Sequence, residues 1–336
     1  MAPTSETRSW DSLVTTTLSA ELDSIRDNIV LNVPYLNYLE QTNGIKKIDG
    51  GDRIKANLRY AKNSTIKAQS EYALFDTTPQ DNVTAAFYNW KLITGTLSIG
   101  YMTRRKNSGK AKIYDLIMEK KEDLSMSFRE KINEQLLVGP ISGSAGYNSE
   151  APDSLLAAIP VLQTATYGGI SRADTNDAGD TYWQNQVLSV GAWSSNGVDK
   201  IREGYRLANR SFKMSPINLI MIDGAYYDLF ENDHVLSLQF PVTGKTSENQ
   251  FNLGIETFKY KKATVMEDPQ LDSTALAYGI NSEFLKLAVD SQTYFKMEPA
   301  VTPSNQAATV APMMLICNHA VSNMRKLVVW HTMTGA

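Results

Sequence analysis

The stretch Gly109–Gly139 reads GKAKIYDLIMEKKEDLSMSFREKINEQLLVG, and the rest of the chain can be arranged around it. Its apolar residues recur at intervals of three and four, at Ile113, Leu116, Ile117, Leu124, Phe128, Ile132 and Leu136. This spacing predicts a helix with one apolar stripe against a core and one solvated face. Gly139 followed by Pro140 is typical of a helix end. At 1.5 Å per residue the helix would be roughly 45 Å long, which indicates an elongated subunit on a helical spine.

Composition places the chain among folded proteins that do not cross a membrane. It has 336 residues, 21% charged and 42% hydrophobic, with a net charge of −3, which is not the basic balance of a dedicated nucleic-acid binder. No run approaches the ~18 apolar residues of a membrane span, and the N-terminus MAPTSETRSWDS lacks the pattern of a signal peptide. The single cysteine, Cys317, excludes an intrachain disulfide framework and a four-cysteine zinc site. We therefore expect a product that is assembled inside a cell.

The segment before the spine predicts an arm followed by a projecting hairpin. Residues 1–17 are polar, and residues 18–29 have helical apolar spacing that Pro34 ends, with an apolar turn or short helix at 35–39. An amphipathic helix of this kind must lie on another surface. Residues 53–60 alternate polar and apolar side chains, as a half-buried strand does.

A polar, turn-rich segment at 62–82 separates this strand from a predicted return strand, Val83–Tyr101. Two long strands around such a segment form a hairpin that extends from its domain. Because a lone hairpin is marginally stable in water, we expect a neighbouring molecule to stabilise it.

The part after the spine predicts mixed helices and strands, so the fold class is α+β. A short helix or turn is expected at 155–159 and a helix at 198–212, and Asp223 is expected to cap another helix. Strands are expected at 216–222, 235–240, 251–267 and 276–288, the last with a turn at Asn281-Ser282. A closing hairpin of buried strands is expected at 313–319 and 321–332.

Two segments resemble ligand-binding loops without completing the motif. Gly244-Lys245-Thr246 resembles the end of a phosphate-binding loop, but the required earlier glycine is Gln239. The segment 174–180 resembles a calcium loop, but Ala178 stands where an oxygen ligand belongs and Asn185 stands where the closing bidentate glutamate belongs. A surface loop and an acidic surface turn are the better interpretations.

Cys317 and His319 share one face of a predicted strand, yet no third group that would orient a nucleophile and base is recognisable. A free cysteine is usually buried, so core packing is the favoured interpretation. We predict no catalytic residue, no cofactor and no metal site.

Charged residues carry more information, because basic ones gather on the hairpin and acidic ones follow the spine. A positive projection and a partly negative helix are complementary between copies of one subunit, although a solvated hairpin is the simpler alternative. The candidate interface residues are Arg53, Lys55, Arg59, Lys62, Lys67, Trp90, Arg104, Arg105, Glu119, Glu122 and Asp123.

Several short motifs occur in a characteristic order. They are Gly50-Gly51-Asp52 before the first strand, Phe87-Tyr88-Asn89-Trp90-Lys91 in the return strand, Asn107-Ser108-Gly109-Lys110 at the spine, and Tyr167-Gly168-Gly169-Ile170 followed by Arg172 and Trp183. With the order of arm, hairpin, spine helix and closing strands, the chain resembles the HK97-type major capsid protein of tailed bacteriophages over nearly its whole length.

This resemblance implies an N-terminal arm at 1–48, an extended loop at 49–105, a peripheral domain at 106–144 and 291–336, and an axial domain at 145–290. It implies a structural protein of the virion that forms pentamers and hexamers of an icosahedral shell around double-stranded DNA, assembled in the host cytoplasm. The loop would lie over a neighbouring subunit, and the arm would reach across another.

The resemblance is incomplete in two respects. Fewer than fifty residues precede the first long strand, so we expect the scaffolding protein to be a separate chain. A portal protein is a further expected partner, and the sequence leaves open whether a decoration protein binds. Some members cross-link a loop lysine to a neighbour's asparagine, but Lys62 and Lys67 have no recognisable catalyst or acceptor, and this chemistry is not carried over. The alternatives are an encapsulin-type cellular compartment and an enzyme with an unrecognised site.

Overall fold

The computed structural model describes residues 33–106, 116–139, 149–176, 179–210, 215–237, 257–271 and 276–334. Several predictions lie outside these residues and are not tested by it. They concern the helix expected at 18–29, the start of the spine at 109–115, Phe212, and the loop at 244–246.

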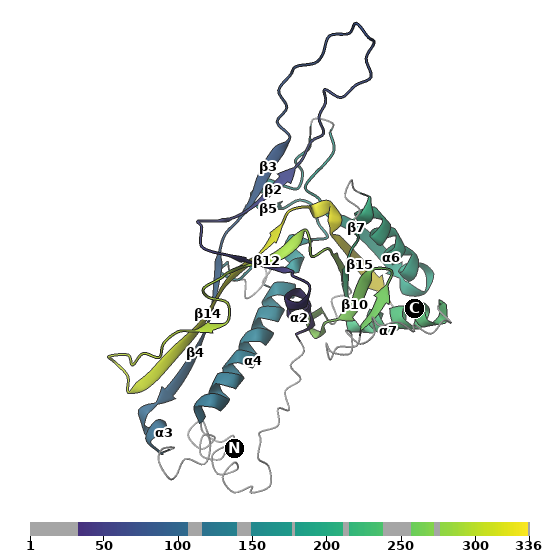
Figure 1. Ribbon diagram of the computed structural model, residues 1–336. Helices are drawn as coiled ribbons and strands as arrows, with labels where there is room; N and C mark the ends of the chain where they lie inside the picture. Colours follow the sequence, from purple (N-terminus) through teal and green to yellow (C-terminus); the bar gives the residue numbers. More distant parts are fainter. Residues whose placement is uncertain are drawn as a thin grey trace.

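The spine is helix α4, Leu116–Leu137, whose 22 described residues extend over roughly 33 Å (Figure 1). Phe128, Ile132 and Leu136 are buried at intervals of four, so the predicted apolar stripe is confirmed over this part. Glu122 and Asp123 are exposed on the opposite side. The helix thus contributes one face to the core and keeps the other in solvent.

The helix ends where the sequence predicts, but the reason is packing rather than a left-handed glycine. A Cβ on Gly139 would lie 2.4 Å from the carbonyl oxygen of Gln135 and 2.8 Å from Cβ of Ser154. Ser154 is the N-cap of the next helix, α5 (Leu155–Ala158), and accepts a hydrogen bond from the Ala157 amide. Only glycine lets the two helix ends approach this closely.

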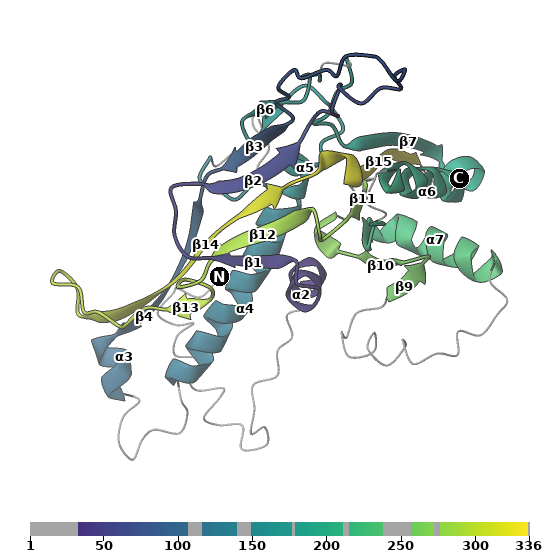
Figure 2. The same cartoon turned by 45° about the horizontal axis from the view of Figure 1, so that its top comes forward.

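The central sheet lies against α4 (Figure 2). Its order is β1-β12-β14-β13, and a fifth strand, β4, pairs with the first part of β14. The bounds are β1 Ile45–Ile48, β4 Lys91–Gly100, β12 Leu285–Asp290, β13 Lys296–Met297 and β14 Ala308–Val321. A short helix, α3 (Tyr101–Lys106), follows β4.

Residues 34–48 are built into this part of the subunit. The short helix expected after Pro34 is confirmed as α2 (Pro34–Gln41), which packs on α4 and buries Tyr35, Leu36 and Leu39. β1 then pairs in parallel with β12. α2 therefore lies on the spine of its own subunit. The surface under the helix expected at 18–29 lies outside the described residues, and the domain boundaries stay a prediction.

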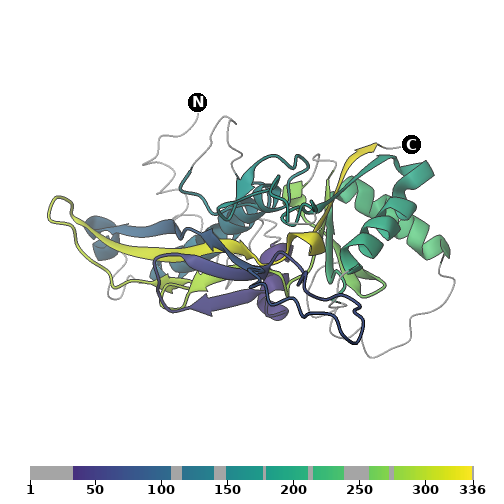
Figure 3. The ribbon, with the colours of Figure 1, turned by 90° about the horizontal axis from the view of Figure 1, so that it is seen from above.

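A second sheet of six strands has the order β7-β15-β11-β8-β10-β9 and its own hydrophobic core. Helix α6 (Trp193–Asn209) packs on β7 and β15, and α7 (Gly224–Ser237) contacts β10 (Figure 3). The strands are β7 Gln186–Ala192, β8 Leu219–Ile222, β9 Thr257–Tyr260, β10 Ala263–Glu267, β11 Ala277–Ile280 and β15 Val328–Thr334. The 3-10 turn η2 (Pro269–Leu271) lies between β10 and β11 of this sheet, and η3 (Met324–Lys326) connects β14 of the central sheet to β15. The fold class is α+β, as predicted.

Three local predictions need correction. The closing strands are not a hairpin, because β14 belongs to the central sheet and β15 to the second sheet. The strand expected at 235–240 is wrong as far as Ser237, since α7 continues to that residue. The single strand expected at 251–267 is a hairpin over its described part, with Lys261 at a positive φ of 57° between β9 and β10.

The cap at Asp223 is confirmed, because its Oδ1 accepts a hydrogen bond from the Ala225 amide at 3.1 Å.

Candidate subunit interface

The extended loop projects from the body between β2 (Ile54–Arg59) and β3 (Val83–Tyr88), which form an antiparallel pair from Ile54–Tyr88 to Arg59–Val83 (Figure 1). The predicted return strand Val83–Tyr101 is wrong as one element. It breaks at Asn89 and Trp90, where the chain leaves β2 and continues as β4 beside β14.

Two hydrogen bonds fix this break. The Trp90 Nε1 donates to the Gly51 carbonyl at 2.8 Å, and Asn318 Nδ2 donates to the Asn89 carbonyl at 2.9 Å. Trp90, predicted as an interface residue, therefore also closes the base of the loop within its own subunit.

The inner side of β2 and β3 rests on a small hairpin, β5 (Thr166–Tyr167) and β6 (Ile170–Ser171). The Phe87 amide donates to the Gly168 carbonyl at 2.9 Å, and the rings of Tyr88 and Tyr167 lie 5.2 Å apart. The Tyr88 hydroxyl donates to the Val321 carbonyl at 2.8 Å. The base of the loop is thus packed on the body, whereas its tip is not.

Gly168 and Gly169 form the turn of this hairpin with φ values of 63° and 78°. Two positive φ angles are what a two-residue turn of this kind requires, and glycine adopts them without strain. A Cβ on Gly168 would also lie 3.0 Å from Ala86 Cβ and from the Tyr88 ring. The turn therefore allows the close approach of β3.

Arg172 and Trp183 support the same hairpin from below. The Trp183 Nε1 donates to the Tyr167 carbonyl at 2.8 Å. The buried Arg172 donates through Nη2 to the Ala158 carbonyl at 2.9 Å and the Ala157 carbonyl at 3.2 Å, and through Nη1 to the Asn185 Oδ1 at 3.2 Å. Burial lowers the pKa of Arg172 to about 10, so the guanidinium stays charged at neutral pH. These side chains of the Tyr167–Trp183 motif have a structural role.

The tip of the loop exposes four large apolar side chains. Ile66, Tyr72, Leu74 and Phe75 are 82%, 91%, 93% and 88% exposed. We call these four residues the apolar tip. From sequence, the segment 62–82 was predicted only to be polar and turn-rich, although Tyr-Ala-Leu-Phe at 72–75 was a visible signal.

Polar contacts hold the tip in shape without burying these side chains. Lys67 Nζ lies 3.1 Å from Asp76 Oδ2, and Asp76 Oδ1 accepts from the Thr78 hydroxyl at 2.7 Å. The hydrogen bond from Thr78, and after it the contact with Lys67, lowers the pKa of Asp76 to about 2. Ser64 also donates to Gln80 Oε1 at 2.9 Å.

The predicted charged residues lie in two separate places. Lys55 and Arg59 share the exposed face of β2, and Arg53 precedes it beside Asp52 at 3.7 Å, whereas Glu122 and Asp123 are on α4 at a distance from this strand (Figure 1). Opposite charges of these two groups are therefore not brought together within one subunit, and their contact between subunits stays a prediction.

The remaining interface candidates have local partners, are exposed without an ion-pair partner among the described residues, or have side chains outside those residues. Arg59 Nε donates to the Ala61 carbonyl at 3.2 Å, and Arg105 stacks at 5.9 Å on the Tyr101 ring. Lys62 is exposed at the start of the tip. The side chains of Arg104 and Glu119 are the ones outside the described residues.

Cys317 and His319 are both wholly buried in β14, and burial raises the pKa of the Cys317 thiol to about 12. At the segment 174–180, Asn176 Oδ1 accepts from the Asp180 amide at 2.9 Å, as in a surface turn. Among the described residues there is no group of three or more metal-binding side chains. None of the helices within these residues is long and apolar enough to cross a membrane.

No protein-family model matches the chain, and no curated protein matches it. Several solved structures do match the chain in fold. The cyanophage A-1(L) capsid asymmetric unit is 15% identical with a TM-score of 0.69, covering 96% of this chain and 99% of that one. The chain has the HK97-type capsid fold. The capsid of an empty GTA particle is 9% identical with a TM-score of 0.61, covering 93% and 94%. The holo-SrpI encapsulin complex from Synechococcus elongatus PCC 7942 is 10% identical with a TM-score of 0.52, covering 96% and 95%. More than nine tenths of this chain is matched in each of these three structures.

Proposed function

We propose that this chain is a structural protein, the major capsid subunit of a tailed-bacteriophage-type shell. In this proposal, subunits form pentamers and hexamers of an icosahedral virion shell that encloses double-stranded DNA. The HK97-type fold supports it, and so does the apolar tip. Large apolar side chains gathered on a projection are typical of a surface that another molecule covers.

The same proposal assigns the loop to a contact between subunits. The apolar tip lies over a neighbouring subunit, and the exposed charges Arg53, Lys55 and Arg59 accompany it. Each ion pair that these charges form is individually weak, but a shell repeats it many times. A separate scaffolding protein and a portal are the further partners, and packaged DNA contacts the inner face without sequence preference.

Cys317 and His319, the pair considered from the sequence as a nucleophile and a base, do not fit a catalytic role. Cys317 and His319 have no solvent access, and a thiol whose pKa is raised to about 12 is not a thiolate at neutral pH. The pair therefore contributes packing to β14.

Negative-stain electron microscopy of the purified chain, with and without a co-expressed scaffolding protein, tests the proposal. Closed shells, or rings of five and six subunits, are expected. Small discrete particles at every concentration would contradict it.

An encapsulin-type compartment is the second candidate, supported by the likeness to the SrpI complex. A phage capsid and an encapsulin compartment differ in what the shell encloses. Shells isolated from the producing cells should contain nuclease-protected DNA if the chain is a capsid subunit, and a co-purifying protein cargo without DNA if it forms a compartment.

A further inference from the structure

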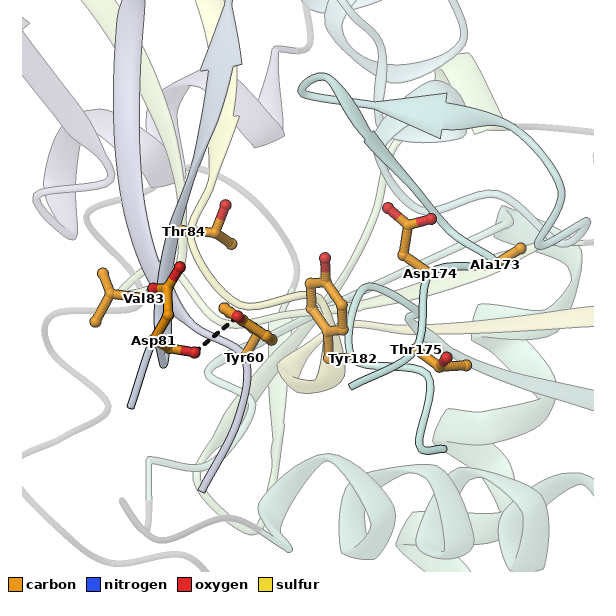
Figure 4. A pocket seen from close by; sticks show the side chains of 8 residues that line it. All are labelled: Tyr60, Asp81, Val83, Thr84, Ala173, Asp174, Thr175 and Tyr182. Carbon is orange, nitrogen blue, oxygen red and sulfur yellow. Dashed lines mark hydrogen bonds between the residues drawn. The ribbon is translucent and has the colours of Figure 1, made fainter. Parts of the chain in front are cut away.

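A cavity of about 570 Å³ lies where the extended loop joins the body (Figure 4). One wall belongs to the loop and the other to the segment that follows β6. The residues that matter for its chemistry are Tyr60, Asp81 and Thr84 on the loop side and Asp174, Thr175 and Tyr182 on the body side. Any group bound here would contact both elements.

Two of the side chains that line this cavity are aromatic. The rings of Tyr60 and Tyr182 are 5.3 Å apart and tilted by 42°. The Tyr60 hydroxyl donates to the Asp81 carbonyl at 2.7 Å, which holds its ring in place. Tyrosine faces carry a partial negative charge that attracts cations.

Two carboxylates flank the rings. Asp81 and Asp174 are exposed, and in the view of Figure 4 the two tyrosines stand between them. Within the described ranges, neither carboxylate has a cationic side chain within ion-pair distance. Ionised carboxylates beside aromatic faces are the surroundings that a lysine ammonium or an arginine guanidinium binds.

The chain itself carries cations that could enter. Lys55 and Lys62 are exposed on the same loop, and no carboxylate of the described residues pairs with either. They do not reach Asp81 or Asp174 of their own subunit. A second copy presents the same basic side chains from outside, so the cavity and the loop are complementary in charge between copies.

We propose that this cavity receives the ammonium or guanidinium group of a basic side chain from a second copy of the chain. The inference rests on the proposed shell and adds a specific receptor to it. A cation bound in this cavity, which Asp81 lines from the loop and Asp174 from the body, joins the root of the loop to the body. Assembly would then fix the direction in which the loop projects.

The test compares Asp81→Asn/Asp174→Asn with Asp180→Asn, a matched control in the same segment whose carboxylate does not line the cavity. Sedimentation measures the concentration at which each full-length chain assembles. We expect the double variant to need roughly fivefold more protein or higher, the effect of an exposed ion pair and a cation–π contact together. Asp180→Asn should assemble like the wild type.

A competition experiment separates loss of binding from damage to the fold. Nα-acetyl-arginine amide, in the millimolar range expected for a single side chain, should inhibit assembly of the wild type and of Asp180→Asn. The uncharged citrulline analogue should not inhibit, and the double variant should not respond to either compound.

Equal effects of the arginine and citrulline compounds on the wild type would overturn the inference, as would normal assembly of the double variant. Both results leave the shell intact. A wild-type chain that never assembles would instead contradict the proposed shell, and the second copy as the occupant with it.

Discussion

The hydroxyl of Tyr35 lies 3.0 Å from Nε2 of His319, and both side chains are wholly buried. On the other side of the imidazole, Nδ1 lies 2.6 Å from the carbonyl oxygen of Asp153. Because a carbonyl only accepts, Nδ1 carries the proton, and Nε2 accepts from the Tyr35 hydroxyl. A neutral imidazole therefore joins α2, β14 and the segment before α5.

Replacing Tyr35 with Phe removes the donor and leaves Nε2 of His319 buried without a partner. We expect the free energy of unfolding to fall by about 1–3 kcal/mol, measured by denaturant titration of the unassembled subunit. Tyr72→Phe is the matched control, because that side chain is 91% exposed, and it should change nothing. Equal stability of the two variants would show that the contact contributes little.

The same histidine predicts a loss of stability in acid. Burial lowers the pKa of His319 to about 4, whereas a histidine of the unfolded chain titrates near 6.5. Between these values the unfolded state binds the additional proton, so stability is complete above about pH 6.5 and decreases as the pH falls to about 4. The decrease should be at most about 3 kcal/mol.

Denaturant titrations between pH 7 and pH 4 measure this slope. Burial raises the pKa of the nearby Asp153 carboxyl, and that group acts in the opposite direction. Because Asp153 is present in every variant, the difference between wild type and His319→Gln isolates the histidine. The slope should flatten in His319→Gln and persist in His331→Gln, and an unchanged slope in both would refute the assignment.

Local sequence patterns were sufficient to predict features that depend on a single segment of the chain. The spacing of Phe128, Ile132 and Leu136 is a property of one helix, and it identified the buried face of α4 correctly. The side chain of Asp223 caps the helix that follows it directly. The alternation at 53–60 likewise identified β2.

Strand partners could not be predicted in this way, because pairing joins distant segments. Nothing local in Val83–Tyr101 shows that its first part pairs with β2 and its second part with β14. The same is true of β14 and β15, which are adjacent in sequence but lie in different sheets. The cavity could not be found either, since Tyr60 and Tyr182 meet only after the loop has packed on β5 and β6.

The turn at Gly168 and Gly169 allows backbone strain to be separated from packing. Both residues have positive φ, but a methyl group on Gly168 would lie 3.0 Å from atoms of Ala86 and Tyr88, whereas one on Gly169 would have nothing within 4 Å. Gly169→Ala should cost about 1 kcal/mol for the backbone conformation alone. Gly168→Ala should cost about 1–3 kcal/mol more, because β3 must shift. Equal losses in thermal or denaturant unfolding would show that β3 does not constrain the turn.

Charge reversal on the loop tests the proposed ion pairs between subunits. The side chains of Arg53, Arg59 and Lys62 are exposed, so Arg53→Glu/Arg59→Glu/Lys62→Glu should leave the circular dichroism of the subunit unchanged. Assembly should be abolished, since a shell repeats the unfavourable contact at every subunit even though one exposed pair is worth under about 1 kcal/mol. Normal shells from this variant, seen by electron microscopy, would show that these side chains do not form ion pairs needed for assembly.

The apolar tip makes a separate prediction, because its contribution comes from burial and not from charge. Tyr72→Ser/Leu74→Ser/Phe75→Ser changes side chains that are 88–93% exposed in the subunit, so the free energy of unfolding should stay the same. Burying even two such side chains against a neighbour contributes at least about 3 kcal/mol, so the concentration needed for assembly should rise more than about a hundredfold. Leu162→Ser, at a position 75% exposed outside the loop, is the control and should assemble normally. If the tip variant assembled as readily as this control, the tip would be a solvated loop, and the shell contact would have to lie elsewhere on the subunit.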